Sequence, residues 1–219
     1  MDSTVTRPRT ASEFVARQLR ARILSGTLPA GAHLRQNHIA TEFGVSSTPV
    51  REALRELAAE GLVVSDAHRG NMVRGLTLPD VCDIYELRLA LEPILIRRSF
   101  PLVADDSLTE AEGMIARMAA TTDMTEWSQM NRHFHAIFWL SHRETRLFRI
   151  VESLQDAAMP YVAMSLYGRD DEIERSNIDH RAILAAYRQG DCEHAVTLNH
   201  RHLEATITII REKLEGSES

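Results

Sequence analysis

The sequence predicts a mainly α protein in two parts: three helices with a β-hairpin, followed by an antiparallel α-helical bundle of about six helices. Helical periodicity runs through most of the chain, and only residues 62–65 and 71–74 have the composition of strands. The net charge also changes sign along the chain. Residues 1–76 hold ten Arg against seven acidic residues, a net charge of +3, whereas residues 77–219 carry −9. We therefore expect two domains, residues 1–76 and residues 77–219.

The first domain begins with a predicted helix over residues 12–25, with Ser12 as its cap. Its apolar face is formed by Phe14, Val15, Leu19, Ile23 and Leu24. A second helix of about residues 36–43 ends at Gly44, which also supplies a tight turn. A third helix, about residues 48–60, follows the run SSTP, in which hydroxyl side chains and a proline are typical of a helix start.

The hairpin over residues 62–74 turns at a polar segment that contains Arg69 and Gly70. The order helix, helix, turn, helix, hairpin is that of a winged helix-turn-helix, whose recognition helix enters the major groove of DNA. We expect the hairpin to act as the wing. Arg69 would then be attracted to the minor groove, and Gly70 would allow close approach to it.

The second domain reads as helix throughout. Breaks fall at Pro101, near residues 121–122, at residues 141–142, at Gly168 and at residues 190–191. They divide it into predicted helices of about residues 79–99, 105–120, 123–141, 144–167, 171–189 and 191–215.

The third helix carries the residues that we expect to contact DNA. Ser46, Ser47 and Thr48 lie at its N-terminus, where unpaired backbone N–H groups favour phosphate contacts. Arg51 can fork onto a guanine edge or bridge phosphates. The alternative is a small helical domain whose arginines are simply solvated.

The stretch LRQNHIATEFGVSSTPVREALRELAAEGLV, residues 34–63, resembles the signature of the GntR superfamily of bacterial regulators. The resemblance covers the first 75 residues and implies that the chain binds double-stranded operator DNA. Members of the family usually have Arg at the position of Ser47, so a common contact is missing here. We expect Arg35 and Asn37, which precede the recognition helix, to compensate.

Four residues of the acidic half form a possible metal site. Asn131 and His135 are four residues apart on one predicted helix, so they share a face. His180 and His202 lie at nearly equal distances from the turn at residues 190–191, so an antiparallel helix pair would bring them together. Three imidazoles and an oxygen suit Zn²⁺, Ni²⁺ or another divalent transition metal. The alternative is that each is an ordinary surface or core histidine.

The second half resembles the all-helical (FCD) ligand-binding domain of the FadR-type branch of this superfamily. Three segments carry the resemblance: IYELRLALEP at residues 84–93, NRHFHAIF at 131–138, and DHRAILAAYRQGDCEHAVTLNHRHL at 179–203. Metal-binding members use Asp-x-x-x-His and two later histidines. This implies a metal, zinc foremost, at Asn131, His135, His180 and His202, with Asn131 in place of the usual Asp.

Arg88 is the residue that we expect to bind an effector. In the resembling family the equivalent Arg faces the cavity and pairs with an anion, and a guanidinium suits a carboxylate. An ion pair with Glu92 or Glu86 is the alternative. A metal with open positions beside an Arg would suit a small carboxylic acid, such as a sugar acid or a dicarboxylate.

We therefore expect a homodimeric regulator, a repressor foremost, that an organic acid controls. The rivals are a ligand-independent architectural DNA-binding dimer and a helical metalloenzyme. No HExxH motif, nucleophile motif, phosphate loop or dinucleotide fingerprint supports an enzyme. Two separated cysteines, no apolar run of 18 residues and no apolar segment in the first ten residues lead us to expect a cytoplasmic protein without a membrane partner.

Overall fold

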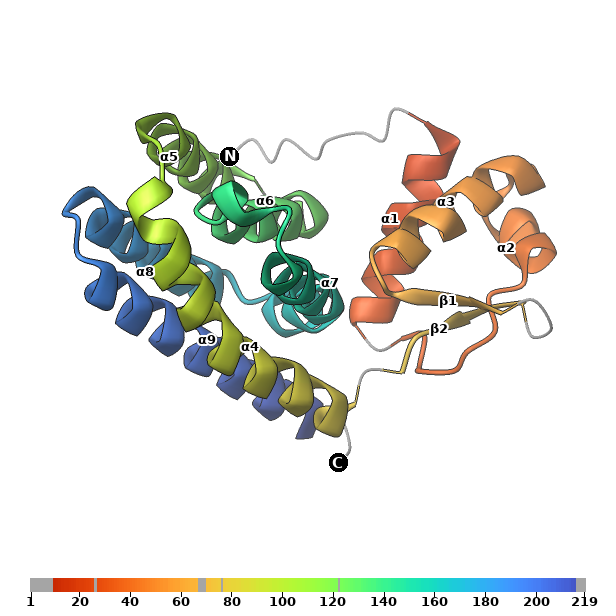
Figure 1. The fold of residues 1–219 in the computed structure, drawn as a ribbon. Helices are drawn as coiled ribbons and strands as arrows, with labels where there is room; N and C mark the ends of the chain where they lie inside the picture. The colour runs from red at the N-terminus through yellow and green to blue at the C-terminus, as the bar shows by residue number, and fades with distance from the viewer. Residues whose placement is uncertain (1–9, 26, 67–69, 76, 122, 216–219) are drawn as a thin grey trace. The chain divides into compact units, whose positions relative to one another are not determined.

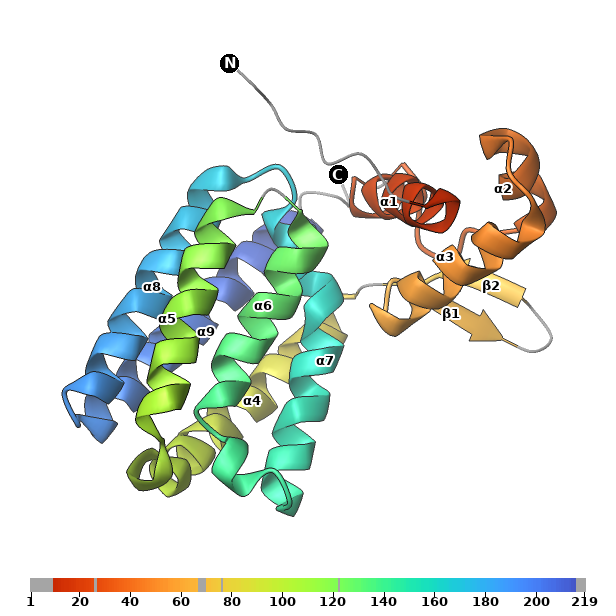
Figure 2. The ribbon, with the colours of Figure 1, turned by 90° about the horizontal axis from the view of Figure 1, so that it is seen from above.

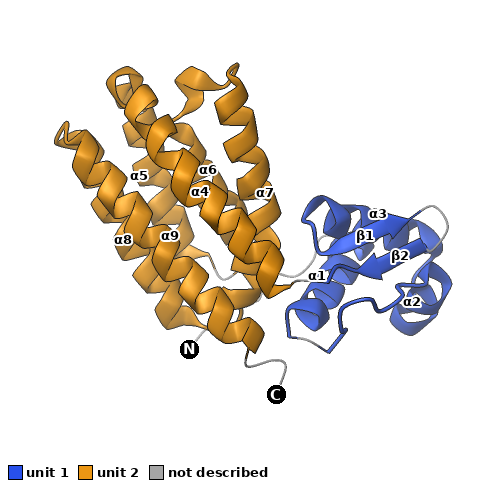
Figure 3. Ribbon diagram, turned by 60° about the horizontal axis from the view of Figure 1, so that its bottom comes forward, with its two compact units in different colours: residues 1–76 blue, residues 77–219 orange. Residues whose placement is uncertain are grey.

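The computed structural model describes residues 10–25, 27–66, 70–75, 77–121 and 123–215. The chain forms two compact units, residues 1–76 and residues 77–219 (Figure 3). Each is described by itself. None of the described helices is long and apolar enough to cross a membrane.

Within the described residues, the first unit has three helices and a two-stranded antiparallel sheet (Figure 1). The elements are α1 (Ala11–Leu24), α2 (Gln36–Phe43), α3 (Ser47–Ala59), β1 (Val63–Asp66) and β2 (Gly70–Val73). Helix α1 packs on α3 and α2 packs on α3, burying Val15, Leu19, Leu54 and Leu57. The predicted mainly α fold, with a winged helix-turn-helix at its start, is confirmed.

The start of α1 differs from the prediction. Thr10, and not Ser12, is the cap: its Oγ1 accepts a hydrogen bond from the backbone N–H of Glu13 at 3.1 Å. The Glu13 carboxylate in turn accepts the backbone N–H of Thr10 at 3.3 Å. This reciprocal capping box satisfies two N–H groups, whereas a cap at Ser12 would leave Glu13 outside it.

The sheet is held in register by four residue pairs, from Val63 opposite Val73 to Asp66 opposite Gly70. The segment before α2 joins it, because the backbone N–H of Leu34 donates to the carbonyl of Asn71 at 2.8 Å. Gly70 has a φ of 76°, a left-handed conformation that glycine adopts without strain.

In the described part of the second unit, six long helices pack in a closed ring (Figure 2). They are α4 (Leu78–Ser99), α5 (Asp105–Ala120), α6 (Met124–Ile137), α7 (Arg146–Leu166), α8 (Asp170–Arg188) and α9 (Cys192–Glu215). Going round the ring, α4 packs on α9, α9 on α8, α8 on α5, α5 on α6, α6 on α7, and α7 on α4 again. The first and last helices of the unit therefore form the seam that closes the ring.

The predicted helix over residues 123–141 is shorter in the structure. Helix α6 ends at Ile137, and a separate 3₁₀ turn covers Leu140–His142. Another 3₁₀ turn, Phe100–Leu102, follows α4. The Pro93 and Pro160 positions are tolerated inside α4 and α7, which continue past both.

Candidate metal centre and nucleic-acid interface

The predicted DNA-contacting residues lie on one exposed surface at the start of α3. Gly44, with a φ of 65°, ends α2 in a left-handed conformation, and Ser46 is the N-cap residue of α3, although its side chain makes no capping hydrogen bond. The side chains of Ser46, Ser47, Thr48 and Arg51 are all exposed. The opposite face of α3 is apolar and buried on α1, so the helix has to present these polar residues outward.

The arginines of the first unit fall into two groups. Arg20 and Arg22 are held by carboxylates: Arg20 pairs with Glu60 at 2.5 Å, and Arg22 pairs with Glu42 at 2.6 Å. Among the described residues, no carboxylate forms an ion pair with Arg51. Its guanidinium therefore remains available for an outside acceptor.

Three further predicted contacts lie near this surface or outside the described residues. Arg35 and Asn37 are exposed at the start of α2, where Arg35 is the cap residue. Gly70 begins β2 at the hairpin turn. Arg69 lies outside the described residues.

The ring of helices brings His135 of α6, His180 of α8 and His202 of α9 together. One ring nitrogen of each lies within 4.8 Å of those of the other two. The centres of the three rings are 4.9–5.2 Å apart. All three side chains are buried, with His180 fully shielded from solvent. The sequence positions of these residues span 68 residues, so only the tertiary fold assembles the cluster.

The chemistry of this cluster fits a divalent transition metal. Burial first, and then the charges of neighbouring histidines, hold the pKa of His135 and of His180 well below 6.5. Both are therefore neutral near pH 7 and offer a lone pair. Neither ring nitrogen of His180 has a hydrogen-bond partner among the described residues, and neither has the buried Oδ1 of Asn131. Buried polar atoms without partners are rare, and a bound cation would give a partner to one ring nitrogen of His180 and to the Asn131 oxygen.

One carboxylate orients a histidine of the cluster without joining it. Nδ1 of His202 lies 3.2 Å from Oδ2 of Asp179, and only the imidazole can donate to an ionised carboxylate. This contact fixes the proton on Nδ1 and leaves Nε2 as the free nitrogen. Sequence reasoning missed Asp179, although it directly precedes His180.

Arg88 is both a pocket residue and a member of a buried ion pair. Its Nε donates to Oε1 of Glu92 at 2.7 Å, and the other oxygen of Glu92 accepts from Nδ2 of Asn199 at 2.9 Å. The guanidinium lies 5.0 Å from the centre of the Tyr85 ring. Burial lowers the pKa of Arg88, but Glu92 and Tyr85 together outweigh it, and the pKa is raised. The ion pair with Glu92 uses one of five N–H donors, so donors remain for an anion.

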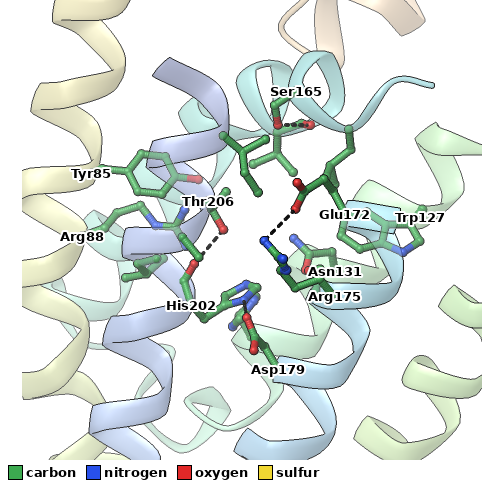
Figure 4. Close-up of a pocket in the computed structure, with 17 residues that line it drawn as sticks. Tyr85, Arg88, Trp127, Asn131, Ser165, Glu172, Arg175, Asp179, His202 and Thr206 are labelled. Carbon is green, nitrogen blue, oxygen red and sulfur yellow. Dashed lines mark hydrogen bonds and ion pairs between the residues drawn. The ribbon is translucent and has the colours of Figure 1, made fainter. Parts of the chain in front are cut away.

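Arg88, Asn131 and His202 point into one pocket from three different helices (Figure 4). Val162 and Leu166 of α7 supply apolar wall, and Arg175 of α8 lies near the rim, where it pairs with Glu172. The volume of this pocket is about 40 Å³. A volume of this size accommodates a few water-sized groups and fits a small ligand.

Two family models match the chain. The FCD domain matches residues 83–205, and the model of bacterial regulatory proteins of the gntR family matches residues 11–73. Together they cover both units.

Curated relatives are regulators too. The gluconate operon transcriptional repressor of Bacillus licheniformis is 29% identical over 81% of this chain and 75% of its own. A protein of Paenarthrobacter nicotinovorans named probable D-xylose utilization operon transcriptional repressor is 34% identical over 80% of this chain and 79% of its own. A solved GntR-family regulator from Pseudomonas syringae pv. tomato is 30% identical, with a TM-score of 0.56, and covers 94% of this chain and 87% of its own.

Proposed function

Because the chain belongs to the GntR family of bacterial regulatory proteins and carries an FCD domain, we propose that it is a transcription repressor controlled by a small carboxylic acid. The acid would bind beside a divalent metal ion in the helical ring. The observation that carries this proposal is the buried cluster of His135, His180 and His202, two of which, His135 and His202, line the same pocket as Arg88.

DNA binding would use the exposed start of α3 in the major groove. Ser46, Ser47, Thr48 and Arg51 would contact phosphates and base edges, with Arg35 and Asn37 beside them. Arg69 and Gly70 would form the tip of the wing. Since Ser47 stands where the family has Arg, Arg51 would supply a larger share of the affinity than in other members.

The metal would be held by His135, His180 and His202, with Asn131 as an oxygen ligand. Neutral imidazoles in this number are the donor set of Zn²⁺, and Ni²⁺ and other divalent metals accept them too. The ion would supply positive charge inside a buried pocket. Arg88 would orient a carboxylate there through paired hydrogen bonds.

Control would pass through α4. This helix begins at Leu78, directly after the first unit in the chain, and carries Arg88 at the pocket. A ligand regulates only if it binds one conformation better than another. An acid that draws Arg88 and the metal ligands together would favour one position of α4 and so change the spacing of two DNA-binding units.

We propose a symmetric dimer as the binding form, because one short helix reads too few bases for useful specificity. The full chain should elute as a dimer in size-exclusion chromatography with light scattering. A monomer at the concentrations that bind DNA would contradict this part of the proposal.

The remaining alternative is an architectural DNA binder that takes no ligand. Such a protein has no use for three buried histidines whose ring nitrogens converge, or for a buried Arg beside them. The matched families are transcription regulators and not enzymes, which agrees with the absence of catalytic motifs.

The test is operator binding by the zinc-loaded full chain, with the operator selected from random or genomic DNA. A panel of small organic acids is added, with and without zinc. At least one acid should weaken operator binding in the presence of zinc and have no effect after chelation. Unchanged DNA affinity with every acid would favour the architectural alternative.

A further inference from the structure

We infer that the effector is a polyhydroxylated carboxylic acid whose hydroxyl groups are bound by Ser128 of α6 and Gln155 of α7. This inference rests on the proposed function, because it concerns the part of the acid that lies away from its carboxylate. The inference adds a separate subsite and the ligand chemistry that the subsite selects.

The subsite is a second cavity that adjoins the metal pocket. Ser128, Gln155, Ala158 and Met159 line it and do not line the first pocket. The residues common to both cavities are Arg88, Asn131, His135 and Val162. A ligand whose carboxylate lies at Arg88 and the metal can therefore extend from the first cavity into the second.

The second cavity contains buried polar groups that nothing in the described chain satisfies. Gln155 is 5% exposed, and neither its Nε2 nor its Oε1 has a hydrogen-bond partner. Ser128 is 4% exposed, and its Oγ has none either. Leaving such groups unpaired in a folded protein is costly, so their retention calls for a partner from outside the chain.

The kind of partner follows from the donors and acceptors. An amide and a hydroxyl each donate and accept hydrogen bonds, as do the hydroxyl groups of a ligand. The volume of this second cavity is about 20 Å³, enough for one or two such groups. A hydroxylated arm fits this cavity, whereas an aromatic ring does not.

A second carboxylate is disfavoured at this end. The other cation that lines the cavity is Arg132, which already pairs with Asp156 and with Glu152. An added anion would have to compete with both of these carboxylates. The geometry therefore favours a sugar acid over a dicarboxylate of the same length.

The experiment measures binding of matched acids to the zinc-loaded full chain by calorimetry. The probes are the aldonates of four to six carbons, ending with D-gluconate, the unsubstituted acids of the same lengths, and adipate. At least one aldonate should bind about tenfold or more tightly than its unsubstituted counterpart, because a site built for hydrogen bonds rejects analogues that lack them. Gln155→Leu and Ser128→Ala should each reduce this preference and leave the affinity for the unsubstituted acid unchanged.

Two controls separate recognition from folding. Gln129→Leu, on the exposed neighbour of Ser128, should keep the full preference. In the absence of any acid, Gln155→Leu should unfold at a temperature no lower than the wild type, since it removes an unpaired buried amide. A structural role for Gln155 predicts a clear loss instead.

Three results would overturn the inference. They are equal binding of hydroxylated and unsubstituted acids to the wild type, an unchanged preference in Gln155→Leu, and tightest binding of adipate. If one of these results is found while an acid still binds in a zinc-dependent manner, the proposed function stands and only the subsite fails. If no acid binds at all, the proposed function fails together with the subsite.

Discussion

His133 and His135 are two residues apart on α6 and have opposite surroundings. His133 is half exposed and lies 3.1 Å from the carboxylate of Glu110 at the surface. His135 is buried against His180 and His202. Residues two apart in a helix point in different directions, so only one histidine of the segment NRHFH can face the interior of the ring. In this structure it is His135.

The first prediction compares these two histidines. His135→Ala should remove a metal ligand and lower the zinc content of protein purified without a histidine tag from about one ion per chain to near zero. His133→Ala, the matched control, should retain full content. Elemental analysis of both proteins measures this, and equal content in the two variants would exclude His135 as a ligand.

Asn131 makes the second prediction. The proposed ligand set is entirely neutral, so nothing in it compensates a double positive charge in a buried pocket. Asn131→Asp should raise the affinity for zinc by about 10-fold to 100-fold, the range over which changes around a metal site act. Competition with a chromogenic chelator measures the change. Equal or weaker binding by Asn131→Asp would show that this side chain does not contact the metal.

The third prediction concerns pH. The pKa values of His135 and His180 are lowered in the folded protein, so these residues stay neutral at a pH where the unfolded chain takes up protons. The unfolded state binds more protons below pH 6.5, and the metal-free protein should therefore lose stability as the pH falls below that value. Each such histidine contributes about 1.4 kcal/mol per pH unit to the slope of the unfolding free energy.

Urea unfolding of the chelated protein at pH 7.5 and pH 5.5 tests this. His180→Asn should make the loss between the two pH values smaller, and His133→Ala should not. An unchanged loss in His180→Asn would mean that this histidine is not kept neutral by the fold.

At the scale of the element, α3 separates its two faces sharply. Its buried face holds Val50, Leu54 and Leu57 against α1, and its exposed face holds Arg51. Arg51→Ala should weaken operator binding by about 1–3 kcal/mol if the guanidinium contacts a base. If it contacts phosphate, the slope of affinity against salt should fall by about one instead. Fluorescence anisotropy over a salt series distinguishes the two outcomes.

Arg143→Ala is the control for this measurement, because Arg143 is an exposed arginine of the second unit, paired with Glu144. It should change neither the affinity nor the slope. Wild-type affinity and slope in Arg51→Ala would remove Arg51 from the interface.

The sequence was sufficient to predict the elements, because periodicity and glycine positions determine them locally. Gly44 ends α2 as expected, and the hairpin and the six long helices are present. The helix ends differed from the prediction in two places. Helix α1 begins after Thr10, because the capping box of Thr10 and Glu13 satisfies two backbone donors. The end of the helix predicted at residues 123–141 is a 3₁₀ turn.

The site was predictable only where spacing carries information. His180 and His202 could be matched by their distances from the turn that joins α8 to α9. Ser128 shares a helix face with Asn131 and His135 and was available to the same reasoning. Gln155 is a polar residue in the otherwise apolar stripe of Val151, Ala158 and Val162, but its lack of partners required the packed structure.

At the scale of the molecule, the proposed DNA-binding surface and the proposed ligand pocket lie in separate units. The fifth prediction follows. Chelation should leave the wild-type protein able to bind its operator, because the start of α3 contains no metal ligand. It should abolish release by the acid, which needs the pocket. An operator affinity that falls on chelation to the level of Arg51→Ala would show that the metal maintains the DNA-binding form.

The seam between α4 and α9 has a consequence for synthesis. A ribosome delivers the winged helix-turn-helix before α9, and the ring has no closing partner for α4 until α9 has emerged. His202 and Asn199 both lie on α9, so the histidine cluster and the hydrogen bond from Asn199 to Glu92 form only after α9 has been synthesised. A nascent protein therefore has the exposed start of α3 before it has the proposed sensor site, and the proposed control of DNA binding can begin only after α9 has been synthesised.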